Sequence, residues 1–249
     1  MAASLSGIAL GVGARNGSTV IRILDTVLVV VLALINPARA WISAIRDDQA
    51  PAPSLLRYSV GLAYHWLLTG WCGIVVLRSH GGFRAIGLQA VRTNDFFSWC
   101  ILLIILDFFA LALLAVFSLL RLLPSPTPDT HAMTPRNRVQ RIYAVLLLAP
   151  TAGFCEEMLY RGYLLSELTR LSHSLLLAMV ISSVAFGVLH CGQGSARVIH
   201  ISIFGVLLAF PVIALGSLYP SIALHAGYDA IYLGWVAPRR YRLRYRRST

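Results

Sequence analysis

The chain alternates between long apolar segments and short polar connections. A helix that crosses a membrane needs about 20 mostly apolar residues, and seven segments approach this length. These candidate spans cover about residues 19–36, 57–78, 97–121, 141–158, 174–191, 197–217 and 219–236. Several are marginal in length, so the pattern predicts six to eight spans in an all-α, polytopic transmembrane helical bundle.

The first candidate span has two interpretations. Its apolar run, residues 27–35, precedes a small-x-small site at Ala38 to Ala40, which is typical of a cleaved signal peptide. However, Asp25 stands at the start of the run, and the region upstream is long for a signal. We favour a retained span and keep the signal peptide as the alternative.

Composition supports a protein of the membrane. The 249 residues are 57% hydrophobic and 12% charged, whereas soluble domains carry about 25% charged residues. All 21 basic residues are arginine. The four cysteines form no CxxC pair, so neither a disulfide framework nor a zinc knuckle is expected.

Positive charge gathers at the end of the chain. Six arginines lie in residues 239–249, directly after the last apolar segment. A basic, tyrosine-bearing tail could bind nucleic acid, but in this position it is typical of a cytoplasmic anchor on anionic lipid. The basic, proline-rich loop 122–141 is expected on the same side. We therefore expect a cytoplasmic C-terminus, membrane lipid as a partner and no nucleic acid.

Ionisable residues inside apolar segments are the candidate chemistry, because a charge at mid-bilayer costs about 2.5–3.5 kcal/mol or more. Glu157 and Arg161 are four residues apart, a spacing that suits an ion pair on one helix face. Glu156 points about 100° away, so it can face a different partner. Alternatively, both acids only cap or pair near the interface.

Two further motifs carry histidine. Phe186 and His190 are four apart, and so are His225 and Asp229, whose carboxylate could accept the imidazole N–H and select its tautomer. Each pair alone could be structural. Together with a free glutamate, two histidines on separate helices suit water activation and oxyanion stabilisation.

Other polar residues within the spans are expected to be structural. Asp107 is interpreted as a hydrogen-bonded acid, and His65 and His200 as satisfied packing residues.

The three motifs in this order, EExxxR, FxxxH and HxxxN/D, resemble the signature of the CPBP family. This family, also called ABI, contains the CAAX proteases and the bacteriocin-processing enzymes. The resemblance covers about residues 141–236, which would be a catalytic helical core. Residues 1–140 match only as hydrophobic spans with little motif content, and 237–249 form the basic cytoplasmic tail.

The resemblance implies an intramembrane endopeptidase. Glu156 would activate the hydrolytic water with help from His190, and His225 and Asp229 would stabilise the oxyanion. Asp229 replaces the asparagine of the CAAX-processing branch. Because an ionised aspartate cannot donate a hydrogen bond, its role here is expected to be the orientation of His225.

The resemblance also implies that Glu157 and Arg161 hold the site together. The use of a metal stays open at this level. Glu156, His190 and His225 could supply three ligands of a catalytic zinc and leave a position for water, although the HExxH signature is absent. The same side chains serve a metal-free glutamate mechanism equally well.

The sequence therefore predicts an enzyme of the bacterial cytoplasmic membrane. Its substrate would be a membrane-associated peptide or protein, of the CAAX type or connected with bacteriocin processing or immunity. One alternative is a catalytically silent immunity or scaffold protein. Another is an ion- or proton-coupled transporter, which would be expected to show internal repeats; no repeat is evident.

Overall fold

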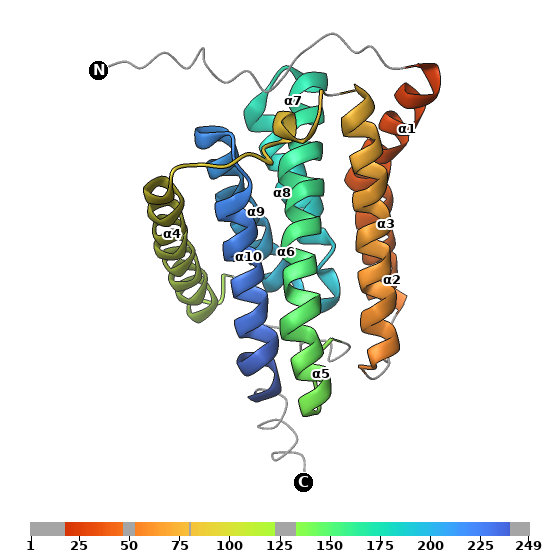
Figure 1. Ribbon diagram of the computed structural model, residues 1–249. Coiled ribbons are helices and arrows are strands. Elements are labelled where there is room, and N and C mark those ends of the chain that lie inside the picture. Colours follow the sequence, from red (N-terminus) through yellow and green to blue (C-terminus); the bar gives the residue numbers. More distant parts are fainter. Residues whose placement is uncertain (1–17, 47–52, 80, 123–132, 240–249) are drawn as a thin grey trace, which may run out of the picture.

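The computed structural model describes residues 18–46, 53–79, 81–122 and 133–239, which form helices, turns and no strand. The α-helices appear in Figure 1. They are α1 (Thr19–Val30), α2 (Asn36–Arg46), α3 (Leu55–Ser79), α4 (Thr93–Leu119), α5 (Arg138–Tyr143), α6 (Ala149–Glu157), α7 (Leu165–Ser172), α8 (Leu175–Val188), α9 (Ser195–Leu215) and α10 (Tyr219–Ile231). Wider π-helical turns join several of them: Val31–Ile35, Ala144–Leu148, Met158–Leu164 and Tyr232–Val236.

The predicted helical bundle is confirmed. Five continuous helices in the described residues are long and apolar enough to cross a membrane. They are Thr19–Arg46, Leu55–Ser79, Thr93–Leu119, Arg138–Ser172 and Ser195–Leu215. The other two predicted spans are also helical: α8 is shorter, with 14 residues, and residues 219–236 form α10 and the π-helical turn after it.

The predicted end of the fourth span at residue 158 is wrong. The helix runs on to Ser172, so Glu156 and Glu157 lie near the middle of a 35-residue helix and not at its end. The extension is stable because it is buried: Leu159, Leu164 and Leu165 are at most 2% exposed. The predicted first span likewise continues beyond residue 36, to Arg46.

Two of the π-helical turns explain how helices pass through proline. Val31–Ile35 precedes Pro37, and Ala144–Leu148 precedes Pro150. A proline has no N–H, and its ring collides with the carbonyl four residues earlier in a regular α-helix. A wider turn changes the position of that carbonyl and allows the helix to continue.

The first helix packs into the bundle. Leu28 and Leu32 are fully buried in a core cluster with Cys72 of α3. The hydroxyl of Tyr163 donates to the Asp25 carboxylate over 2.7 Å. This packing favours the retained-span interpretation of the segment.

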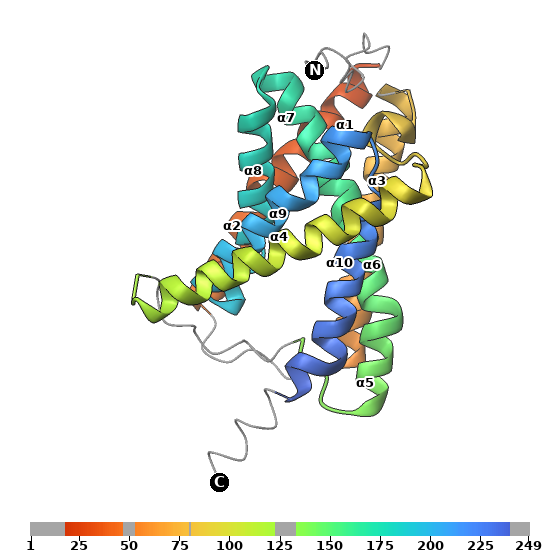
Figure 2. The same cartoon turned by 90° about the vertical axis from the view of Figure 1, so that its left-hand side faces the viewer.

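Apolar side chains cover the outside of the bundle. α4 crosses the outer face of α9 and α10 diagonally (Figure 2) and packs against both. Its side chains Phe97, Phe108 and Phe109 are more than half exposed, an arrangement that suits lipid and not water. Together with the apolar helices, this surface marks an integral membrane protein.

The helix pair that carries the candidate chemistry is α6 and α10, which lie side by side in Figures 1 and 2. A Cβ atom on Gly153 would lie 2.7 Å from the backbone nitrogen of Ala226. Small residues allow helices in membranes to approach this closely. The contact holds Glu156 and Glu157, one turn after Gly153, against His225.

We predict that Gly153→Ala separates α6 from α10 and destabilises the protein by about 1–3 kcal/mol, as overpacking does. Gly70→Ala on α3 is the matched control, since nothing lies within 4 Å of its added Cβ, and its effect should be neutral or stabilising by up to about 1 kcal/mol. Unfolding in detergent micelles measures both. Equal stability of the two variants would contradict the close approach.

Candidate active site

A fully buried carboxylate lies at the centre of the candidate site. Glu157 is 0% exposed, and its Oε1 accepts hydrogen bonds from Arg161 Nη1 at 3.0 Å and from His225 Nδ1 at 2.7 Å. The predicted ion pair of Glu157 and Arg161 is therefore present. Glu157 also connects α6 to α10, which the spacing of residues on one helix could not reveal.

Arg161 is buried beside the site and neutralises Glu157. Its guanidinium lies 4.0 Å from the centroid of the Phe186 ring, and its Nε donates to the Gly205 carbonyl over 3.4 Å. A Cβ on Gly205 would lie 2.6 Å from Arg161 Nη2. Glycine at this position of α9 thus leaves the space that the guanidinium occupies.

The bond from Glu157 determines the tautomer of His225. Because Glu157 is an acceptor paired with Arg161, Nδ1 of His225 carries a proton and donates it. Nε2 then points away from Glu157, and it lies 3.7 Å from Glu156 Oε2 and 3.7 Å from Asp229 Oδ2. Both separations are too long for direct hydrogen bonds.

The predicted role of Asp229 in selecting the His225 tautomer is therefore wrong. The i, i+4 spacing brings the Asp229 carboxylate to Nε2, at 3.7 Å, and Glu157 holds the other ring nitrogen at 2.7 Å. Glu157 selects the tautomer because the packing of α6 on α10 brings its carboxylate closer to the His225 ring than the helical turn brings Asp229. The Asp229 side chain, 28% exposed, lies at the open side of the ring.

Glu156 faces a different set of partners from its neighbour, as the helical wheel predicts. Its Oε2 is the atom near His225, and its Oε1 lies 2.9 Å from Nε2 of His65 on α3. The interpretation of His65 as a packing residue misses this bond. His65 lies 91 residues before Glu156 in the chain, so the sequence gives no signal of this contact. The packing of α3 on α6 creates it.

His190 contacts the other site residues only through Phe186 among the described contacts. Its Nδ1 lies 3.1 Å from the Phe186 carbonyl oxygen, and the two rings meet edge to face with centroids 5.2 Å apart. The Phe186 ring also contacts His225, at 5.7 Å. Among the described contacts, no hydrogen bond or ion pair joins His190 directly to Glu156.

The structure thus brings five of the six predicted site residues into direct polar contact or close approach. It places the sixth, His190, against the Phe186 ring, which also contacts Arg161 and His225. The five are Glu156, Glu157, Arg161, His225 and Asp229.

The possible zinc ligands do not form a metal site. In the described part of the chain, no group of three His, Cys, Asp or Glu side chains is arranged to hold a metal ion. Glu156, His190 and His225 do not fit the three-ligand zinc site that the sequence left open.

A second histidine–carboxylate pair lies outside the site. His200 Nε2 of α9 contacts Asp107 Oδ1 of α4 at 3.0 Å, and both residues are buried. This pair confirms that Asp107 is hydrogen-bonded.

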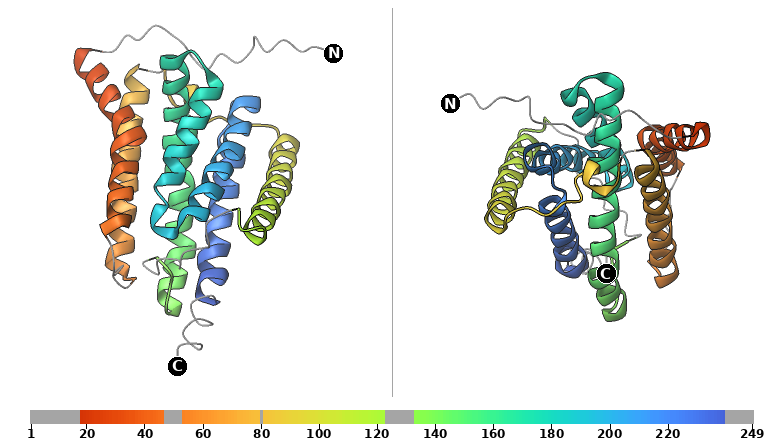
Figure 3. Two further views of the ribbon diagram at one scale, coloured as in Figure 1. Left: turned by 180° about the vertical axis from the view of Figure 1, so that it is seen from behind. Right: turned by 45° about the horizontal axis from the view of Figure 1, so that its top comes forward.

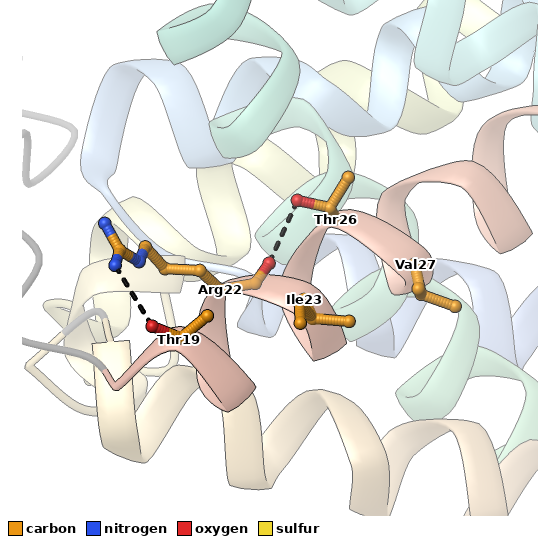
Figure 4. Close-up of a pocket in the computed structure, with 5 residues that line it drawn as sticks. All are labelled: Thr19, Arg22, Ile23, Thr26 and Val27. Carbon is orange, nitrogen blue, oxygen red and sulfur yellow. Dashed lines mark hydrogen bonds between the residues drawn. The ribbon is translucent and has the colours of Figure 1, made fainter.

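An open pocket of about 300 Å³ on α1 shares no residue with the site. In Figure 4, two of its polar side chains bond within the helix: Arg22 to Thr19, and Thr26 to the Arg22 carbonyl. The lining residues are Thr19, Arg22, Ile23, Thr26 and Val27.

Comparison with known proteins agrees with the motifs. Residues 138–231 match the model of the family described as type II CAAX prenyl endopeptidase Rce1-like. Over this segment the chain is similar to the Rce1-like family. The matched region contains all three motifs, and the resemblance to the CAAX proteases is confirmed. No curated protein and no solved structure matched the chain.

We predict that Arg161→Ala leaves the buried Glu157 carboxylate without its cation and destabilises the protein by about 3–5 kcal/mol, the usual effect of breaking a buried ion pair. Arg84→Ala, at an exposed arginine, should change stability by less than about 0.5 kcal/mol. Unfolding in detergent micelles compares the two. A small effect of Arg161→Ala would show that Glu157 does not depend on this charge.

Proposed function

We propose that the protein is an intramembrane endopeptidase that hydrolyses a peptide bond with Glu156 as the base. The observation that carries the proposal is the pairing of Glu156 Oε2 with His225 Nε2 at 3.7 Å, inside a bundle whose exterior is apolar. The separation is too long for a direct bond, and a water molecule bonded to both atoms at ordinary distances fits it. The similarity of residues 138–231 to the Rce1-like family supports the same reaction class.

In the proposed reaction, Glu156 Oε2 accepts a proton from this water as the water oxygen bonds to the substrate carbonyl carbon. The carbonyl oxygen becomes an oxyanion, which Nε2–H of a protonated His225 stabilises. Glu156 then passes the proton to the nitrogen of the leaving amine as the C–N bond breaks. The carboxylate is thereby restored.

The surroundings of His225 favour the protonated form that this step requires. Glu157 accepts from Nδ1, and the carboxylates of Glu156 and Asp229 both lie 3.7 Å from Nε2. Opposite charges at this range stabilise an imidazolium. Asp229 therefore acts through its charge, and not as the hydrogen-bond donor that an asparagine would be.

His190 is proposed to assist the water. The Phe186 carbonyl can only accept, so Nδ1 of His190 carries the proton of their 3.1 Å contact. In the neutral ring this leaves Nε2 as an acceptor, which can take a hydrogen bond from the attacking water.

The proposed substrate is a membrane-associated peptide or protein, of the CAAX type or one connected with bacteriocin processing or immunity. An apolar groove of about 590 Å³ supports a lipid-bearing substrate. It is lined by Ala90, Val91, Thr93, Phe96, Phe97, Tyr219, Ile222 and Ala223.

We also propose that the C-terminus is cytoplasmic, in a bacterial membrane. The end of α4, the start of α5 and the end of the last helix lie toward the same end of the bundle (Figures 1 and 2). The described chain begins at the opposite end (Figure 3). The loop 122–141 and the arginines of residues 239–249 would then share the cytoplasmic side, as the positive-inside rule expects.

A silent immunity or scaffold protein is the alternative. Such a protein would need Glu157 and Arg161 for its packing, but would not need Glu156. The arrangement of Glu156 Oε2 toward His225 favours the enzyme.

We predict that Glu156→Gln, and separately His190→Ala, lowers kcat for a fluorogenic farnesylated CAAX peptide by about 10²-fold or more, the usual contribution of general acid–base groups. Reconstituted protein in lipid vesicles is the preparation, and the unprenylated peptide tests prenyl dependence. Unfolding midpoints near that of the wild type control for folding. Wild-type kcat in either variant would remove that residue from the proposed mechanism.

The metal question has its own test. We expect the purified protein to contain less than one equivalent of zinc and to keep its activity in 1,10-phenanthroline, because the described side chains offer no three-ligand site. Metal analysis and a chelator titration measure both. Loss of activity that added zinc restores would show that the site rearranges around a metal.

A further inference from the structure

His65 also contacts the proposed base, Glu156, in addition to His225. His65 lies on α3, which packs along α6 (Figure 1). Its Nε2 is 2.9 Å from Glu156 Oε1, and its Nδ1 is 2.8 Å from the carbonyl oxygen of Gly61, one turn earlier. The stacking of Trp66 on Phe154, with centroids 5.8 Å apart, joins the same two helices beside this bond.

The two contacts of His65 show which of its ring nitrogens carry a proton. A backbone carbonyl can only accept, so Nδ1 carries a proton toward Gly61. The 2.9 Å contact between Nε2 and Glu156 Oε1 requires a second proton, since a lone pair would otherwise face a carboxylate. When Glu156 is an ionised base, that proton lies on Nε2 and His65 is an imidazolium.

We propose that His65 is a positioning residue of the active site. It holds Oε1 of Glu156 and leaves Oε2, 3.7 Å from His225 Nε2, as the oxygen that receives the proton of water. The charged ring also favours the ionised form of Glu156 before the reaction. This inference rests on the proposed function, in which Glu156 is the base.

The proton balance keeps His65 out of the chemistry itself. The water proton moves to Oε2 and then to the leaving amine, while His65 retains both of its ring protons throughout. Its contribution is the orientation and charge of Glu156, so its loss should lower kcat and leave KM nearly unchanged.

A purely structural role would look different. His200 and Asp107 form a comparable bond between two helices, from Nε2 to a carboxylate oxygen over 3.0 Å, but neither is a member of the active site. Their removal should affect unfolding alone. The pair is therefore the matched control for His65 and Glu156.

The test compares His65→Leu, His65→Gln and His200→Leu with the fluorogenic farnesylated CAAX peptide in lipid vesicles. We expect His65→Leu to lower kcat by about 10- to 100-fold, the effect of a misplaced catalytic group, at unchanged KM. His65→Gln should recover most of this loss, because its amide N–H₂ can donate to Oε1. His200→Leu should lower the unfolding midpoint and leave kcat unchanged.

Wild-type kcat in His65→Leu, or an equal loss in His65→Gln, would overturn the positioning role while leaving Glu156 as the base. If the wild-type protein cleaves neither the farnesylated nor the unprenylated CAAX peptide, the proposed function fails. A double-mutant cycle of unfolding midpoints with His65→Leu and Glu156→Ala then decides the contact separately. Coupled shifts support the bond between the two residues, and additive shifts overturn it.

Discussion

The structure depends on one charged group that has no access to water. Glu157 is fully buried and accepts from Arg161 on its own helix and from His225 on α10. An isolated carboxylate inside a membrane bundle would be very costly, so the closed bundle depends on both partners. The same bonds orient the imidazole at the candidate site, which makes the stability of the bundle and the geometry of the site inseparable.

A hydrogen bond at Nδ1 orients each of the three histidines of the site. Nδ1 of His65 faces the Gly61 carbonyl, Nδ1 of His190 faces the Phe186 carbonyl, and Nδ1 of His225 faces Glu157. Each bond places a proton on Nδ1 and leaves Nε2 for other partners. Two of the three acceptors are backbone carbonyls one helical turn earlier, so the local helix orients these rings without a second side chain.

Close packing of the helices makes these hydrogen bonds and ring contacts possible. Gly153 allows α6 to approach Ala226 of α10, and Gly205 leaves space for the Arg161 guanidinium. In a membrane, small residues at such contacts replace the hydrophobic driving force that acts in water. The Phe186 ring then forms a wall against Arg161, His190 and His225.

The helical class, the approximate positions of the spans and the Glu157–Arg161 pair can be predicted from the sequence, because they follow from the length of apolar runs and from spacing along one helix. The continuation of this helix past residue 158 could not be predicted, since burial by other helices stabilises that extension. The bond of Glu157, and not Asp229, to His225 Nδ1 and the contact of His65 with Glu156 are visible only in the folded protein. Those contacts join separate helices, and the side-chain partners across a helix interface depend on packing that no single segment encodes.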